Sequence, residues 1–266
     1  MAAPSILFSA DELNPARVDE PFEPQAAALR QAGFRCWVLP PQRDRLVTRG
    51  DTVAGTEILF RGWMMTPTEY LAFEAMCTAA GAALVVNAQA YAAAHHISGW
   101  LNTISDLTPQ TVLLPAGADL RTELGTLGWS QFFIKDFVKS LKTSRGSIAH
   151  SPDDAVALVE EMLSYRGEIE GGFAIRQVEA FVPETERRYF VLDGRPHSPI
   201  VGESIPPIVV EVAKRFTASR FFSVDVVQTV EGRARVVEIG DGQVSDLVGW
   251  APERFAAMLA EHWPAA

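Results

Sequence analysis

Three acidic residues stand in or directly after apolar stretches near the end of the chain. Asp225 lies within RFFSVDVVQT (220–229), and Glu238 and Asp241 lie within ARVVEIGDG (234–242). Carboxylate oxygens are hard ligands of the kind that Mg²⁺ prefers. The spacing therefore predicts a divalent metal site made of these three acids, and the alternative is a solvated turn in which one acid points to water.

A hairpin would bring two of these acids together. If a two-residue turn centred on Glu231 and Gly232 joins the two strands, Asp225 faces Glu238 across an antiparallel ladder. Their Cβ atoms would then be about 4.5–5.5 Å apart. Two like charges in an apolar ladder need either a proton or a cation between them, so this register strengthens the prediction of a metal site.

Basic residues suited to phosphate precede the acids. Lys135 lies near the end of the predicted strand QFFIKDF (131–137), and the loop 139–147 that follows contains Lys139 together with further basic and hydroxyl side chains. A basic loop after a strand can close over phosphates. The alternative is a loop whose charges are simply solvated.

Two arginines occur in strands whose alternation points them inward. Arg176 lies in FAIRQV, and Arg188 lies in RRYFVL, where it or its neighbour must face the packed side. A buried guanidinium requires an anion, and its planar fork suits phosphate or carboxylate. Glu179 and Glu186 lie between the arginines and could accept hydrogen bonds from an amine and from sugar hydroxyls, or could pair with the arginines.

The elements that must position these residues differ between the two parts of the chain. Over the first ~90 residues, apolar runs alternate with helical spacing, which predicts an α/β layer with a mostly parallel sheet. No G-x-G-x-x-G dinucleotide pattern follows the first strand. The later part is rich in strands, which predicts an α+β domain. The expected strands are 5–8, 34–40, 56–62, 82–87, 131–137, 172–182, 187–194, 220–229 and 234–240, and the expected helices are 23–33, 66–81 and 151–165.

The composition excludes several classes of protein. The 266 residues carry a formal net charge of -10, which argues against general nucleic-acid binding. Neither a signal peptide nor an apolar run of about 18 residues is present, so we expect no membrane span. Cys36 and Cys77 form no C-x-x-C pair and fit a cytoplasmic protein. His95 and His96 lack ligand spacing in the sequence, which favours a structural or surface role.

The order of these motifs resembles the ATP-grasp family, and most closely the clade named for two arginines and one lysine. The resemblance covers about residues 130–250. It implies an α/β N-terminal (Rossmann-like) domain at residues 1–100, followed by an α+β ATP-grasp domain at residues 101–266 with mainly antiparallel sheets. The ATP-grasp domain would comprise a lid-like subdomain at 131–182 and a metal-binding subdomain at 183–266.

The resemblance also implies a role for each candidate residue. ATP phosphates would be held by Lys135 and by the loop that carries Lys139, adenine by Glu179 and the backbone near Phe181, ribose by Glu186, metal by Asp225, Glu238 and Asp241, and phosphate or an acyl-phosphate by Arg176 and Arg188. The chain departs from the family at Gly240, where many members have Asn, and Asp241 follows one position later.

The implied activity is that of an ATP- and Mg²⁺-dependent carboxylate–amine ligase that acts through an acyl-phosphate intermediate. Its partners would be small-molecule or peptide carboxylates and amines, with an amino acid or a peptide as the expected substrate class. One alternative is a nucleotide-binding module of the same fold without ligase turnover. Another is an α/β plus α+β protein whose acids are purely structural.

Overall fold

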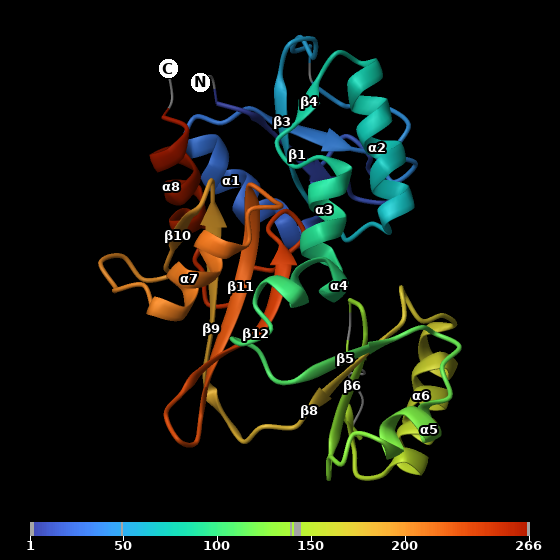
Figure 1. The fold of residues 1–266 in the computed structure, drawn as a ribbon. Helices are drawn as coiled ribbons and strands as arrows, with labels where there is room; N and C mark the ends of the chain where they lie inside the picture. Colours follow the sequence, from blue (N-terminus) through green and yellow to red (C-terminus); the bar gives the residue numbers. More distant parts are fainter. Residues whose placement is uncertain (1–2, 49, 139, 141–144, 265–266) are drawn as a thin grey trace. The chain divides into compact units, whose positions relative to one another are not determined.

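The computed structural model describes residues 3–48, 50–138, 140 and 145–264, and it divides into two compact units (Figure 1). Unit 1 comprises residues 1–94, 187–224 and 240–266, and unit 2 comprises residues 95–186 and 225–239. The units therefore differ from the predicted sequential division at residue 100. Segments from the last third of the chain belong to unit 1 together with its first 94 residues.

Unit 1 contains a parallel sheet, as the alternation of strands and helices predicts. Its order is β2-β1-β3-β4, with β1 at Ser5–Ser9, β2 at Cys36–Leu39, β3 at Glu57–Arg61 and β4 at Ala83–Leu84. The central strand β1 pairs in parallel with β2 and with β3. Parallel sheets are covered on both faces, which explains the nearly unbroken apolar run SILF. The more specific likeness to a Rossmann fold stays a prediction.

Helices from both ends of the chain cover this sheet. α1 (Glu23–Gln31) packs with α8 (Pro252–His262), while Figure 1 shows α2 (Pro67–Ala79) on the other side of the sheet. α2 begins with the predicted capping box, in which Thr66 and Glu69 exchange side-chain and backbone hydrogen bonds. Side chains of α8 belong to the same buried cluster as those of β1, so the last helix completes the core around the first strand.

Unit 2 contains an antiparallel sheet with helices on one face. Its order is β5-β8-β6-β7, with β5 at Thr111–Leu114, β6 at Phe132–Asp136, β7 at Ile148–Ala149 and β8 at Phe173–Gln177. α5 (Leu120–Gly125) and α6 (Pro152–Arg166) bury their apolar side chains against it. α6 starts as predicted, because the Ser151 hydroxyl accepts from the Asp154 amide and Pro152 occupies the first turn.

A third sheet has the order β10-β9-β11-β12. Its strands are β9 (Phe181–Leu192), β10 (Arg195–His197), β11 (Phe221–Thr229) and β12 (Ala234–Asp241). The predicted antiparallel, strand-rich character of the later part of the chain is confirmed. Residues 225–239, which contain Asp225 and Glu238, belong to unit 2, whereas Asp241 belongs to unit 1.

The turn between β11 and β12 differs from the predicted one. The Thr229 amide donates to the Arg233 carbonyl over 2.8 Å, and the Gly232 amide donates to the Thr229 carbonyl over 2.8 Å. Gly232 has a φ of 79°, so the loop has three residues and closes with glycine in the left-handed region. The prediction of a two-residue turn was wrong, because the observed loop is one residue longer. The direct pairing of Asp225 with Glu238 therefore does not follow from the observed turn.

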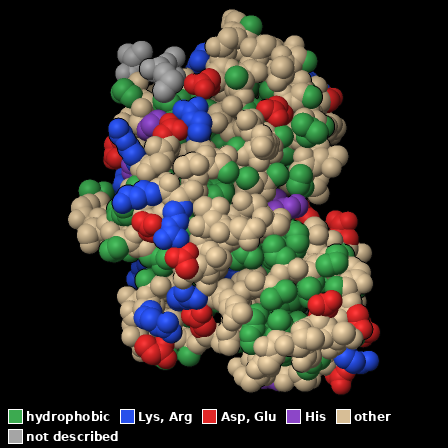
Figure 2. All heavy atoms as spheres, in the orientation of Figure 1, with side chains coloured by type: hydrophobic (Ala, Val, Ile, Leu, Met, Phe, Trp, Pro, Cys, Tyr) green, Lys and Arg blue, Asp and Glu red, His purple; other side chains and the backbone are tan. Residues whose placement is uncertain are grey.

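The remaining elements connect these layers. They are η1 (Glu20–Phe22), α3 (Ala88–His95), α4 (Ile97–Trp100), η2 (Leu101–Thr103) and α7 (Pro207–Arg215). None of the helices within the described ranges combines the length and the apolar character that a membrane crossing requires. On the face drawn in Figure 2, basic side chains lie among acidic ones and form no continuous basic surface.

Candidate functional site

One face of the unit 2 sheet carries two of the predicted basic residues. In the ladder between β6 and β8, Lys135 pairs with Ala174 and Phe133 pairs with Arg176. Paired residues share a face and alternate residues return to it, so Lys135 and Arg176 project from the same side. Ile134 and its neighbours point the other way, into the core beneath α5 and α6. The sheet thus separates its apolar face from a face with two cations.

Lys135 is paired with one of the predicted metal ligands. Its Nζ donates to Oε1 of Glu238 over 2.5 Å, and only 6% of the lysine side chain is exposed. The Glu238 side chain keeps 35% of its surface exposed. The structure therefore joins two residues that the sequence assigns separately to phosphate and to metal. Glu238 is an acid with a bound cation, as an acid in a largely apolar strand requires.

Arg176 is buried with part of its guanidinium unsatisfied. Nη1 donates to the Val237 carbonyl over 2.5 Å, whereas Nε and Nη2 are buried and have no hydrogen-bond partner among the described residues. The guanidinium carbon lies 5.8 Å from the ring centre of Trp100. Burial lowers the pKa of Arg176 to about 10, and the nearby charge of Glu238 opposes that shift. A buried fork with free donors is suited to an anion.

Asp225 is the second predicted metal ligand that lies in unit 2. It lies in β11 and is buried, with 6% of its surface exposed. A buried carboxylate needs a proton, a cation or hydrogen-bond donors. Asp225 and Glu238 both offer the oxygen donors that a hard divalent cation takes, so the residues present fit Mg²⁺ chemically.

Glu179 forms an ion pair, but with Arg235 rather than with either of the arginines singled out from the sequence. Its two carboxylate oxygens accept from Arg235 over 2.9 and 2.7 Å, in a forked pair. Arg235 also donates to the backbone carbonyls of Asp106 and Thr108. The pair therefore anchors β12 to the segment before β5. Sequence reasoning missed Arg235 because a strand position alone does not reveal a partner 56 residues away.

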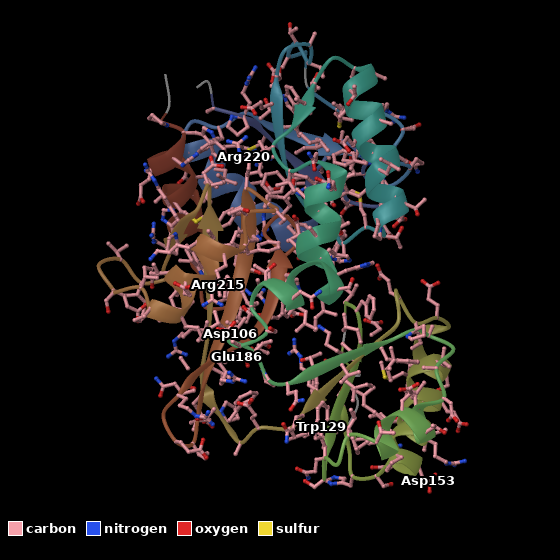
Figure 3. The ribbon with its side chains drawn as sticks, viewed as in Figure 1. Asp106, Trp129, Asp153, Glu186, Arg215 and Arg220 are labelled. Atoms are coloured by element: carbon pink, nitrogen blue, oxygen red, sulfur yellow. The ribbon has the colours of Figure 1, made fainter. Side chains whose placement is uncertain are left out.

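Three further predicted residues lie in or near β9. Phe181 opens the strand and is half-buried, and Glu186 is exposed further along the same strand, where Figure 3 labels it. Arg188 lies in the part of β9 that belongs to unit 1, and its Nη1 donates to the Asp246 carbonyl over 2.9 Å. Arg176 and Arg188 therefore belong to different units.

The basic loop is described only in part. Lys139 and Lys142 lie outside the described residues. Arg145 forms ion pairs with Asp154 and with Glu161, both on α6. Its charge is thus balanced within unit 2 by a helix rather than directed to solvent alone.

Asp241 lies in unit 1 and is fully buried. Oδ1 accepts from the backbone amide and the side-chain amide of Gln243 over 3.0 and 3.2 Å, and Oδ2 has no partner among the described residues. Burial raises the pKa of Asp241 to about 7. The side-chain amide of Gln243 also donates to the Tyr70 hydroxyl, and the Arg61 guanidinium donates to the Gly242 carbonyl. This network was not found from the sequence, although Gln243 stands beside the acids, and the role of Asp241 as a metal ligand stays a prediction.

Gly240 occupies the position where many family members have Asn. A Cβ atom on Gly240 would lie 3.0 Å from Oγ of Ser245 and 3.1 Å from Oγ of Ser223. Those two hydroxyls are hydrogen-bonded to each other over 2.7 Å. The glycine leaves room for these two serines, and a larger side chain at this position would crowd them.

Comparison with solved structures identifies proteins of the same fold. The D-cycloserine synthetase DcsG has a TM-score of 0.64 at 17% identity, covering 97% of this chain and 99% of that chain. The ATP-grasp ligase PsnB, complexed with precursor peptide PsnA2 and AMPPNP, has a TM-score of 0.60 at 13% identity, covering 99% and 98%. D-alanyl-alanine synthetase A from Vibrio cholerae has a TM-score of 0.60 at 10% identity, covering 98% of each chain.

The sequence comparison gives the family. No curated protein matches the chain. The matching family is described as an ATP-grasp domain, family 3 of the clade named for two arginines and one lysine. It covers residues 126–259, which include β6, the paired Lys135 and Glu238, and the buried Arg176. This match spans half of the chain, and the sequence resemblance is thereby confirmed. The chain belongs to this third family of the two-arginine, one-lysine clade of ATP-grasp domains.

Proposed function

We propose that the chain is an ATP- and Mg²⁺-dependent ligase that joins a carboxylate to an amine through an acyl-phosphate. The observation that carries the proposal is Arg176, whose buried guanidinium has two donors without a partner among the described residues and lies on the same sheet face as Lys135. A folded protein rarely leaves such donors unsatisfied. An anionic group of the substrate or of the intermediate would satisfy them.

The metal would be held by Asp225 and Glu238, with Asp241 as a third proposed ligand. When bound, Mg²⁺ supplies charge neutralisation for the phosphates. Glu238 already carries a cation, the Lys135 ammonium. We propose that Lys135 turns from Glu238 to the ATP phosphates when nucleotide and metal bind.

The other nucleotide contacts are proposed by family resemblance. Lys139 would close over the phosphates, Phe181 and Glu179 would flank adenine, and Glu186 would bind ribose. The ion pair with Arg235 gives Glu179 a fixed orientation. Arg188, with Arg176, would hold the transferred phosphate or the acyl-phosphate.

The substrate class is proposed from the similar structures. One of them is an ATP-grasp ligase solved with a precursor peptide, and another is a D-alanyl-alanine synthetase. In the proposed reaction a carboxylate oxygen attacks the γ-phosphorus, the bond to ADP breaks, and an acyl-phosphate forms. An amine then attacks the acyl carbon and phosphate leaves. Catalysis of this kind depends on positioning and charge neutralisation rather than on a covalent enzyme intermediate.

A hydroxylamine trap tests the reaction without knowledge of the natural amine. The chain is incubated with Mg²⁺-ATP, hydroxylamine and pools of amino acids or short peptides, and ADP and hydroxamate are measured together. Equal amounts of ADP and hydroxamate from one pool support the ligase. A thermal shift with Mg²⁺-ATP but no hydroxamate from any pool favours the nucleotide-binding module without turnover, and no shift at all contradicts both.

Variants of Arg176 separate its chemical role from its structural one. Arg176→Lys keeps a cation but loses the fork, and Arg176→Met keeps much of the volume without charge. We expect kcat/KM to fall by about 10²–10³ for Arg176→Met, with nucleotide binding changed much less, because the guanidinium acts on the transferred group. If both variants turn over like the unmodified chain, the assignment of Arg176 fails.

A further inference from the structure

Two histidines and a glutamate of unit 2 converge on one another, and none of them is among the candidate ligase residues. Nε2 of His96 lies 3.0 Å from Oε1 of Glu170, and Nε2 of His95 lies 3.7 Å from the same oxygen. One potential ligand atom from each residue lies within 4.8 Å of the others. All three side chains are largely shielded, with 4%, 18% and 27% of their surfaces exposed for His95, His96 and Glu170.

The backbone explains how two consecutive histidines reach one carboxylate. His95 is the last residue of α3, and His96 is extended, with φ −95° and ψ 133°, as it caps α4. The change of conformation between them leaves the two rings stacked with centres 5.5 Å apart. A regular strand would have sent the rings to opposite faces. Sequence spacing therefore gave no signal of this cluster.

Backbone hydrogen bonds hold the two ligand segments together. The amide of Phe137 donates to the Glu170 carbonyl over 3.1 Å, and the amide of Ile97 donates to the Phe137 carbonyl over 3.0 Å. The ring of Phe137 also lies edge-on to that of His96. The residue between the two segments thus fixes the glutamate and the histidines relative to one another, which is the preorganisation that a ligand site needs.

The two distances from the histidine nitrogens to the Glu170 oxygen are close to those within a coordination sphere. Ligands that each lie about 2.0–2.2 Å from a tetrahedral metal ion are about 3.3–3.6 Å apart. The two observed distances, 3.0 and 3.7 Å, bracket that separation.

We infer that His95, His96 and Glu170 form a binding site for a first-row transition metal ion of the Zn²⁺ class. Two imidazole nitrogens and one carboxylate oxygen are a donor set that suits Zn²⁺ and its neighbours better than Mg²⁺, which prefers oxygen alone. A tetrahedral ion would keep one position for water. The site uses none of the residues proposed for ATP or Mg²⁺, so it stands or falls separately from the proposed ligase activity.

Calorimetric titration of the untagged, chelator-treated chain with Zn²⁺ tests the site. We expect one equivalent to bind with a Kd of about 10 μM or tighter. His95→Ala and His96→Ala should each weaken binding by about 100-fold or more, and Glu170→Gln, which keeps the shape of the side chain, by about 10-fold or more. Mg²⁺ should not compete.

Two matched controls assign the ion to these residues. His150→Ala removes an exposed histidine of unit 2 that contacts Gln131 and should leave the titration unchanged. The double variant Asp225→Asn with Glu238→Gln should leave it unchanged as well. Absence of saturable binding below about 100 μM, or full binding in both His95→Ala and His96→Ala, would overturn the inference.

A spectroscopic measurement covers the case in which the histidine variants fail to fold. Co²⁺ bound by two imidazoles and a carboxylate in a tetrahedral site gives stronger visible absorption than hydrated Co²⁺. The unmodified chain should show such a band at one equivalent, and Glu170→Gln should shift or abolish it. A spectrum identical to hydrated Co²⁺, or one unaffected by Glu170→Gln, would contradict the site.

Discussion

At the scale of single residues, the buried carboxyl group of Asp241 links the fold to pH. Its folded-state pKa of about 7 lies above the ordinary value of 3.8, and burial is the main cause. Between about pH 3.8 and about pH 7, the folded chain therefore keeps a proton on Asp241 that the unfolded chain has released. The stability that this proton contributes is complete below about pH 3.8 and is lost as the pH rises through about 7.

Asp241→Asn should remove this dependence. The free energy of unfolding of the variant minus that of the unmodified chain should grow by up to about 1.4 kcal/mol per pH unit between about pH 4 and pH 7. Urea unfolding at several pH values measures the difference. Ser245→Ala, which removes no titratable group and keeps the buried carboxyl, is the control and should give a difference that stays flat. A flat difference for Asp241→Asn would mean that the buried carboxyl is ionised throughout.

Residue patterns predicted some of the candidate site and missed the rest for physical reasons. Strand alternation predicted a buried Arg176, and Arg176 is buried, although on the face of the sheet opposite the core beneath α5 and α6. Lys135 and Glu238 were both selected, but their ion pair was not, because it joins strands whose contact depends on the tertiary fold. The partner of Glu179 was missed for the same reason.

At the scale of elements, Gly172 controls how β8 begins beside β5. Its φ is 141°, and a Cβ atom there would lie 2.5 Å from the Leu114 carbonyl oxygen. Gly172→Ala should lower the free energy of unfolding by about 2–4 kcal/mol, since it combines backbone strain with a clash against backbone. Denaturant unfolding monitored by circular dichroism measures this loss.

Gly117→Ala is the matched control for that substitution. Gly117 has ordinary backbone geometry, and nothing lies within 4 Å of the position that its Cβ would take. We expect a change of no more than about 0.5 kcal/mol. Equal effects of the two substitutions would show that the contact with Leu114 does not limit the approach of the strands.

Local signals predicted elements well where they act within a few residues. The capping box at Thr66 and the Ser151-Pro152 start of α6 are such signals, and both were confirmed. The turn after β11 was wrong, because Glu231-Gly232 permits either a two-residue or a three-residue loop. In the observed three-residue loop, the Thr229 hydroxyl accepts a hydrogen bond from the Arg233 amide.

At the scale of the whole molecule, each unit is built from segments that are separate in the sequence. Composition and strand order suggested domains that follow one another in sequence, whereas unit 1 draws on three separate segments. The reason is that α8 supplies apolar side chains to the core around β1, and no local pattern at either end reveals the other.

Removal of α8 should therefore disrupt the parallel sheet made by the first part of the chain. A chain that ends at residue 250 loses Phe255, Leu259 and Trp263 from the core, and we expect loss of cooperative unfolding. Thermal unfolding by circular dichroism and limited proteolysis measure this effect. A chain that ends at residue 264 is the control and should unfold like the full chain. Cooperative unfolding of unit 1 in the shorter chain would show that α8 is not needed to complete the core around β1.

A milder change probes the same contact. Phe255 is fully buried, with its ring centre 5.2 Å from that of Phe190 and 4.8 Å from the guanidinium carbon of Arg61. Phe255→Ala should cost about 3–5 kcal/mol of unfolding free energy, because it leaves a cavity at the junction of three segments. Phe255→Leu should recover part of that loss, and equal stability of all three proteins would contradict the importance of this ring.

The packing of α8 against the core around β1 has a consequence for how the protein is made. β1 leaves the ribosome before α8, the helix that helps to cover it, has been synthesised. At about 5–20 residues per second, translation of the segment between β1 and α8 takes on the order of 10–50 s. During that time the apolar strand SILFS has no complete core to enter. Nascent chains should therefore depend on chaperones until α8 has emerged, and unit 1 should acquire protease resistance only then.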